Sequence, residues 1–164
     1  MIAHKRCLIV TAFLIISILP LAAQTAAEID VLIEESEVTV AVSSRFVLGS
    51  AGLVTSALSG EEAEKTAYQI AFSRGWVKGN ADDIITLRDL SLLVMRAFDM
   101  KGGVMYSLTR NSRYAHREMI YRRLIQGRTD PGLGVSGLRL LQIIGSVLNY
   151  TGEYDQLETE LSSE

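Results

Sequence analysis

The segment AYQIAFSRGWVKG, residues 67–79, aligns without gaps with AHREMIYRRLIQG, residues 115–127, at a constant offset of 48 residues, so the sequence contains an internal repeat. Both copies lead through a short turn to a hydroxyl residue that follows a β-branched apolar one. An abbreviated first copy keeps this second half alone, and the intervals between the three starts are 47 and 50 residues. The three starts are Val38-Thr39, Ile85-Thr86 and Val135-Ser136. A period of this length is typical of tandem supersecondary units, which bury their apolar faces against their neighbours.

Each unit is predicted to be a pair of helices. Thr39, Thr86 and Ser136 are expected helix N-caps, and Asp89 three residues after Thr86 resembles a capping box. Residues 38–42 alternate as a strand would, but their alignment with the other copies favours a helix. We therefore predict an all-α fold of tandem helix-pair repeats, five to six helices packed as one small bundle.

The first residues have the pattern of a secretory signal peptide. Lys5 and Arg6 precede an apolar run that ends at Leu19 and is followed by small residues. We predict a signal peptide over residues 1–23, with cleavage near Ala23 or alternatively Ala27; an uncleaved N-terminal anchor is the other interpretation. The apolar run is shorter than the roughly 20 residues that span a bilayer.

The remaining chain is predicted to be one helical repeat domain, residues 27–150, followed by an acidic, disordered tail. The expected units are 27–60, 61–103 and 104–150, with Val104–Tyr114 as a linker, and the tail is 151–164. Without residues 1–23 the chain has 14 basic and 19 acidic residues, a net charge of −5, and no cysteine. An exported protein without disulfides depends on its core for stability. We expect a periplasmic or cell-surface protein, with no membrane span after cleavage and no nucleic-acid partner.

The repeat resembles the S-layer homology (SLH) repeat. The matching words are RGWVKG at 74–79 with IITLRDLSLLVMRA at 84–97, and RLIQG at 123–127 with Asp130-Pro131 and Val135-Ser136. The resemblance implies packed helical pairs, usually in threes, that bind secondary cell-wall polymers. Two features differ: the family's opening Phe/Asp-Val-Pro stretch with its downstream His-Trp-Ala is absent, and its arginine after the threonine is replaced by Leu87 and Gly137. Arg88 is displaced by one residue, which turns it by about 100° around a helix.

The candidate binding residues form a basic and aromatic cluster in the last unit. Guanidinium groups suit the carboxylates or phosphates of an anionic polymer, and arginine and tyrosine are enriched in binding hot spots. The cluster comprises Arg110, Arg113, Arg117, Arg122, Arg123 and Arg128 with Tyr106, Tyr114 and Tyr121. The expected partner is a cell-wall polymer or an envelope protein, and a homo-oligomer is compatible with either. The alternative is a solvated helix face that pairs with the acidic first helix or tail.

Residue patterns for catalysis or metal binding are weak. His116, the one histidine after the predicted signal peptide, is expected on a surface or partly buried helix face, and without partners it forms no metal site. Asp82, Asp83 and Asp130 are expected turn residues, so no metal or cofactor is predicted. The predicted function is a non-enzymatic envelope binding or structural module. The alternatives are a wall hydrolase that uses carboxylates such as those of Glu61, Glu62, Glu64 and Asp89, or a purely structural assembly subunit.

Overall fold

The computed structural model of this 164-residue chain describes residues 19–55 and 60–162, with side chains for 27–55 and 60–152. All regular structure in the described residues is helical, which confirms the predicted all-α class. The chain divides after Glu35 into two compact units. Most of the predicted signal peptide lies outside the described residues.

The described part of the first unit is helix α2, Leu19–Glu34. This helix starts earlier than the expected one at 27–35 and runs unbroken through Ala23 and Ala27, the two predicted cleavage positions. Pro20 is compatible with the helix because it lies in the first turn, where its missing N–H has no intrahelical partner to lose.

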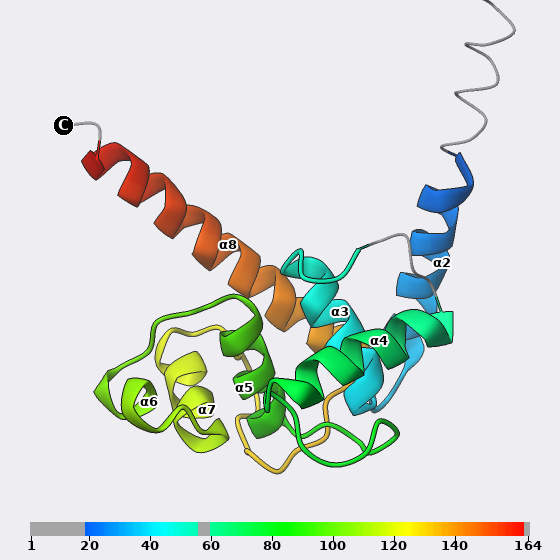
Figure 1. Cartoon of the computed structure of the whole chain (residues 1–164), viewed down its shortest axis with the longest axis horizontal. Coiled ribbons are helices and arrows are strands. Elements are labelled where there is room, and N and C mark those ends of the chain that lie inside the picture. The colour runs from blue at the N-terminus through cyan, green and yellow to red at the C-terminus, as the bar shows by residue number, and fades with distance from the viewer. Residues whose placement is uncertain (1–18, 56–59, 163–164) are drawn as a thin grey trace, which may run out of the picture. The chain divides into compact units, whose positions relative to one another are not determined.

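The second unit contains the other six described helices. They are α3 Val40–Ser50, α4 Gly60–Ser73, α5 Leu87–Ala97, α6 Val104–Thr109, α7 Ser112–Tyr121 and α8 Gly137–Ser162. Helix α3 packs against α4, α5 and α8, while α7 packs between α5 and α6 (Figure 1). The hydroxyl-started helices α3 and α5 are thus each paired in space with the helix of the next copy, α4 or α7. This differs from the expected units 61–103 and 104–150, which would pair α4 with α5 and α7 with α8.

The helix starts lie where the hydroxyl pattern predicts them. The Thr39 hydroxyl accepts a hydrogen bond from the Val42 amide at 3.3 Å. Helix α3 begins at Val40, so the strand-like alternation of residues 38–42 does not form a strand. Thr86 accepts from the Asp89 amide at 3.2 Å and donates to the Asp89 carboxylate at 2.6 Å. Ser136 accepts from the Arg139 amide at 3.4 Å, so all three helices begin with a side-chain cap.

Backbone hydrogen bonds join the three segments that precede these helices. The Val38 amide donates to the Val135 carbonyl oxygen at 2.8 Å, and the Ile85 amide donates to the Val38 carbonyl oxygen at 3.1 Å. Antiparallel bridges link Thr39 to Ile84 and Thr86 to Gly134. We call this meeting point, residues 38–41, 81–88 and 131–135, the junction. Its Val38, Ile85 and Val135 side chains are buried, so the helix starts share one apolar centre.

A second set of hydrogen bonds at the junction comes in two equivalent pairs. The Val40 amide donates to the Asp83 carbonyl oxygen, and in the same way the Leu87 amide donates to the Leu133 carbonyl oxygen, both at 2.9 Å. The bond from the Ala41 amide to the Ala81 carbonyl oxygen, at 3.0 Å, likewise matches the bond from the Arg88 amide to the Pro131 carbonyl oxygen, at 3.1 Å. Within each pair the donors differ by 47 residues and the acceptors by 50. These are the intervals between the helix starts in the sequence.

Two boundaries differ from the sequence-based expectation. The predicted linker Val104–Tyr114 contains helix α6, so the described residues hold seven helices where five to six were expected. A helix this short presents too few residues for its period to be recognised. Helix α8 also continues to Ser162, through the tail predicted to be disordered, and the Gln, Leu and Glu residues there are good helix formers.

We expect Thr86→Val to lower the free energy of unfolding by about 1 kcal/mol, because the helix loses its hydroxyl cap and Asp89 loses a donor. Urea unfolding followed by circular dichroism measures this change. The matched control is Thr109→Val, since that hydroxyl is exposed and bonds only within the short α6. Equal stabilities of the two variants would contradict the assigned role of Thr86.

Candidate functional site

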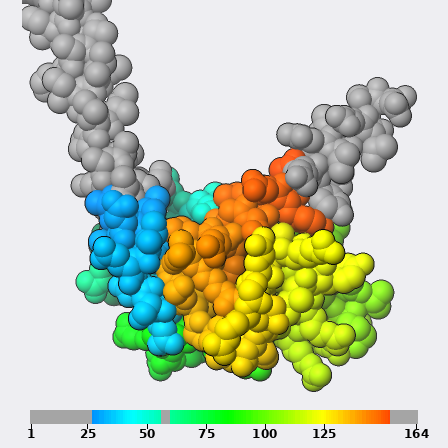
Figure 2. All heavy atoms as spheres, turned by 180° about the vertical axis from the view of Figure 1, so that it is seen from behind, coloured from blue at the N-terminus to red at the C-terminus, as the bar shows by residue number. Residues whose placement is uncertain are grey.

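The predicted arginine and tyrosine cluster lies on α6, α7 and the loops beside them. Tyr106 is on α6, Arg110 ends α6, and Arg113, Tyr114, Arg117 and Tyr121 are on α7. Arg122, Arg123 and Arg128 follow α7. In Figure 2 these residues fall in the yellow-green and yellow segments at one side of the second unit. The cluster is therefore one region of the surface, formed by consecutive elements.

A cavity of about 310 Å³ lies between α6 and α7. Four of the predicted site residues line it: Tyr106, Tyr114, Arg117 and Tyr121. The last three are on one face of α7, because they are spaced by three and four residues. The remaining lining comes from Glu118 and from residues 103–105 at the start of α6. The cavity therefore joins aromatic walls to one guanidinium and one carboxylate.

Tyr106 forms the inner wall of this cavity and is buried. Its ring lies so close to Gly102 that a Cβ there would be 2.4 Å from the Tyr106 Cδ1 atom, which explains the glycine. Burial raises the pKa of the Tyr106 phenol, and the nearby Arg96 and Arg110 act in the opposite direction. Tyr106 is thus a neutral packing residue.

Arg122 is engaged inside the protein. Its Nε donates to the Glu118 carboxylate at 2.9 Å, and one terminal nitrogen donates to the Tyr150 hydroxyl at 2.8 Å. The other terminal nitrogen donates to the Lys101 carbonyl oxygen. Glu118 in turn accepts from the Gly103 amide at 3.1 Å. The Glu118–Arg122 pair therefore ties α7 to α8 and to the residues before α6, so Arg122 is a structural residue.

The other arginines of the cluster are exposed. Arg113 and Arg117 project from α7, and Arg110, Arg123 and Arg128 lie in connecting segments. Two of these, Arg110 and Arg123, have left-handed backbones with φ of 46° and 59°; Arg110 is the C-cap of α6, and Arg123 follows the C-cap of α7. In the part of the chain with described side chains, no ion pair neutralises Arg110, Arg113 or Arg117. Their charges are available to a partner.

Exposed apolar side chains beside the cavity were not predicted from the sequence. Val104, Leu108 and Tyr121 are 82%, 79% and 84% exposed, and Met105 is also exposed. Val104 and Leu108 share one face of α6 because they are four residues apart. The apolar residues of VMYSLT, residues 104–109, are the sequence feature that indicates this surface, although the segment is predicted to be a linker.

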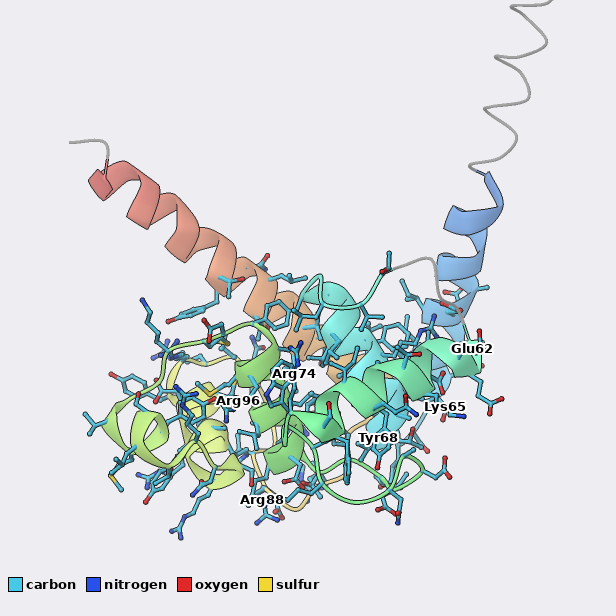
Figure 3. The ribbon with its side chains drawn as sticks, in the orientation of Figure 1. Glu62, Lys65, Tyr68, Arg74, Arg88 and Arg96 are labelled. Carbon is cyan, nitrogen blue, oxygen red and sulfur yellow. The ribbon has the colours of Figure 1, made fainter. Side chains whose placement is uncertain are left out.

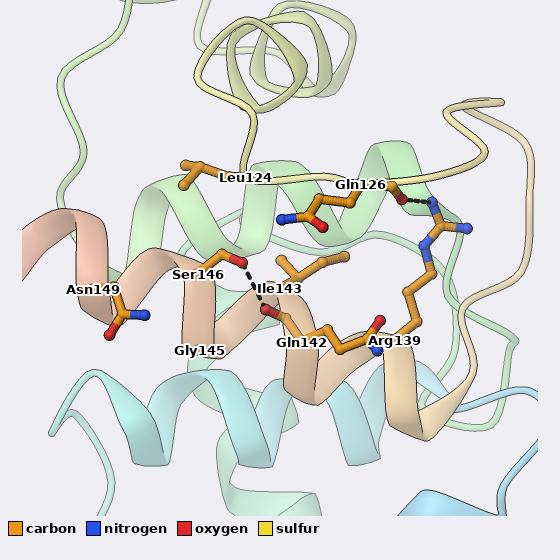
Figure 4. Close-up of a pocket in the computed structure, with 8 residues that line it drawn as sticks. All are labelled: Leu124, Gln126, Arg139, Gln142, Ile143, Gly145, Ser146 and Asn149. Carbon is orange, nitrogen blue, oxygen red and sulfur yellow. Dashed lines mark hydrogen bonds between the residues drawn. The ribbon is translucent and has the colours of Figure 1, made fainter.

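A second cavity, of about 350 Å³, lies between α8 and the segment after α7 (Figure 4). Half of its eight lining residues are polar and uncharged: Gln126, Gln142, Ser146 and Asn149. Arg139 is held at its rim by the carbonyl oxygens of Gln126, at 3.1 Å, and of Arg128. The lining residues that the structure describes include no carboxylate, histidine or cysteine. This cavity offers hydrogen bonds but no titratable pair for acid–base chemistry.

His116 is buried, with 6% of its surface exposed, although the sequence predicted a surface or partly buried position. Its Nε2 atom is buried without a hydrogen-bond partner among the described residues. Burial lowers the pKa of the imidazole, and the positive charges of Arg88 and Arg139 act in the same direction. A backbone hydrogen bond with Thr129 and the charge of Asp130 oppose that shift. His116 is therefore neutral in the folded protein.

The four carboxylates that a wall hydrolase could use are in a helix cap, beside an arginine or in the exposed first turn of a helix. Asp89 accepts from Thr86, and Glu64 lies 3.8 Å from Arg45. Glu61 and Glu62 are exposed in the first turn of α4, whose outer face also carries Lys65 and Tyr68 (Figure 3). In the described part of the chain, no group of three or more His, Cys, Asp or Glu residues could hold a metal ion. None of the helices in that part is long and apolar enough to cross a membrane.

No protein-family model matches this chain, and no curated protein and no solved structure is significantly similar to it. The resemblance to the SLH repeat therefore remains a prediction from the residues themselves.

Arg122→Met should lower the free energy of unfolding by about 2 kcal/mol, since the Glu118 carboxylate loses its charged donor in a largely buried place. Arg117→Met, on the neighbouring helix α7, should change the free energy of unfolding by less than about 0.5 kcal/mol because Arg117 is exposed. Chemical unfolding of both variants tests this difference. A destabilised Arg117 variant beside an unaffected Arg122 variant would reverse the assignment.

His116 should make stability depend on pH below neutrality. The unfolded imidazole binds a proton near pH 6.5 and the folded one only at lower pH, so the unfolded state binds more protons in between. The stability that this residue contributes is thus fully present above pH 6.5 and is lost as the pH falls towards the folded pKa. Unfolding free energies between about pH 8 and pH 5 should fall more steeply for the wild type than for His116→Asn. Parallel curves would show that His116 does not cause the loss.

Proposed function

We propose that this protein is a non-enzymatic binding module of the cell envelope, exported by its N-terminal segment and built from three SLH-like helical units. In this proposal it binds an anionic envelope component through the surface of α6 and α7. The observation that carries the proposal is the separation of charge along the chain. Residues 99–128 contain seven Lys or Arg and two Asp or Glu, a net charge of +5 in a chain whose total is −3.

The hydrogen bonds of the junction support the repeat. The bonds of Val40 and Ala41 recur at Leu87 and Arg88 with donor and acceptor offsets equal to the sequence intervals. The helix contacts recur in the same way, because α4 packs on α3 as α7 packs on α5. In the proposed arrangement the packed pairs are α3 with α4 and α5 with α7, which is offset from the expected units 27–60, 61–103 and 104–150, and α8 alone represents the third copy. The three hydroxyl-started helices all begin at the junction.

The exposed arginines support an anionic partner. A guanidinium group presents donors in a planar fork that matches carboxylate and phosphate groups, and Arg113 and Arg117 lie on one face of α7. Tyr114 and Tyr121 add aromatic surface beside Arg117 in the cavity. The only carboxylate of that cavity, Glu118, is already paired with Arg122. The net field at this surface is therefore positive and suits an anion.

A cell-wall polymer is the partner that the SLH resemblance implies, and an acidic envelope protein is the alternative. The position of the family's arginine gives no support of its own, because Arg88 is on the outer side of α5 and its Nε lies 3.9 Å from the Asp89 carboxylate. The α6–α7 surface is the better candidate because its arginines lack such partners among the described side chains.

The test compares two double variants that remove the same charge. Arg113→Ala/Arg117→Ala should weaken binding to isolated cell envelopes about tenfold or more, whereas Lys65→Ala/Lys78→Ala, elsewhere on the surface, should change it little. Wild-type binding should decrease with added salt because exposed charges are screened. Sedimentation with envelopes measures both effects. Equal binding by the two double variants would rule out this surface.

A further inference from the structure

Helix α6 exposes the apolar side chains that a short helix would normally bury. Of its six residues only Tyr106 is buried, while Val104, Met105 and Leu108 are exposed. The exposed Tyr121 of α7 lines the same cavity as Val104 and Met105. We call these four exposed residues the apolar ridge. Apolar area left in water contributes nothing to folding, and a group of such side chains marks an interaction surface.

Basic residues surround the apolar ridge. Lys101 precedes α6 and Arg110 ends it, while Arg113 and Arg117 project from the neighbouring α7. All four side chains are exposed. The acidic residues of this stretch are Asp99 and Glu118, and Glu118 is occupied by Arg122 and the Gly103 amide. The surface is thus a protruding apolar helix within a set of cations.

This combination selects among anionic partners. A hydrated polymer can pair with the arginines but offers no apolar phase for Val104 and Leu108. An acidic protein would need a concave apolar site to receive a projecting helix. A bilayer with anionic lipids presents a plane of phosphates with acyl chains directly beneath it, and tyrosine is a residue that favours the boundary between them.

We propose that α6 docks on the surface of an anionic lipid bilayer. In this docking mode the Val104, Met105 and Leu108 side chains enter the acyl boundary, and Tyr121 lies at the head-group level. Lys101, Arg110, Arg113 and Arg117 contact the lipid phosphates. This inference rests on the proposed function, because it names the anionic component that the same surface binds.

The experiment places a probe on α6 in the full chain, so that the signal is local whatever the N-terminal segment does. Cys7→Ser removes the native thiol, and Leu108→Cys carries an environment-sensitive NBD label; the matched control carries the label at Lys65→Cys on α4. The labelled proteins are mixed with two kinds of vesicle, one of phosphatidylcholine alone and one of phosphatidylcholine with about one third phosphatidylglycerol.

We expect the label at position 108, and not at 65, to brighten and shift to the blue with the anionic vesicles only. Arg113→Gln/Arg117→Gln should weaken this partitioning about 30-fold, since each basic residue near such a surface contributes about 1 kcal/mol. Val104→Ser in the labelled chain should weaken it several-fold, and a label at Met105→Cys gives a second position if one variant is unfolded by circular dichroism.

Three results would overturn the inference. A label at 108 that ignores both vesicles, while Arg113→Ala/Arg117→Ala still loses envelope binding, would leave the proposed function intact and reject the bilayer. A response to lipid-free cell walls or to an extracted envelope protein, without one to vesicles, would identify the polymer or the protein as the partner instead. If the label at position 108 responds to none of these partners and Arg113→Ala/Arg117→Ala binds envelopes as well as the wild type does, both proposals fail.

Discussion

The structure depends on backbone hydrogen bonds between chain segments that are far apart in sequence. At the junction, Val38 is bonded to both Ile85 and Val135 within a buried apolar centre. Buried amide and carbonyl groups are costly when unpaired, so each segment must keep its register against the others. Because α3, α5 and α8 begin directly after these segments, the junction sets where the second unit's central helices start. The packing of α4 on α3, and of α7 on α5, follows from those starting points.

A second constraint, the Glu118–Arg122 pair, controls the candidate site. Arg122 reaches Glu118, the Tyr150 hydroxyl and the Lys101 carbonyl oxygen, and the ring of Tyr150 lies 5.1 Å from its guanidinium carbon. These contacts hold Lys101 and Gly103, directly before α6, against the end of α7. Neighbouring arginines of one cluster therefore have different roles. Arg122, directly after α7, is enclosed by partners, whereas Arg113 and Arg117 on α7 face solvent.

Parts of this architecture could be predicted because their causes are local. Thr39, Thr86 and Ser136 cap helices through their own hydroxyl groups, so a pattern of a few residues was sufficient. Repeat alignment also chose the helix at residues 40–50 over a strand-like alternation. Helix α6 was missed because six residues give no usable period, and the burial of His116 was missed because its own helix is rich in charged residues.

The helical class, the positions of the capped helix starts, and the region where arginine and tyrosine concentrate follow from the amino-acid sequence. These features depend on side-chain pattern and on contacts within a few residues. Three other features arise from the packing of the folded chain: the enclosure of Arg122, the exposure of the apolar side chains of α6, and the lowered pKa of His116. Each of those outcomes depends on residues distant in sequence, such as Tyr150 for Arg122, and the residues that bury His116 together with Arg88, whose proximity no local pattern encodes.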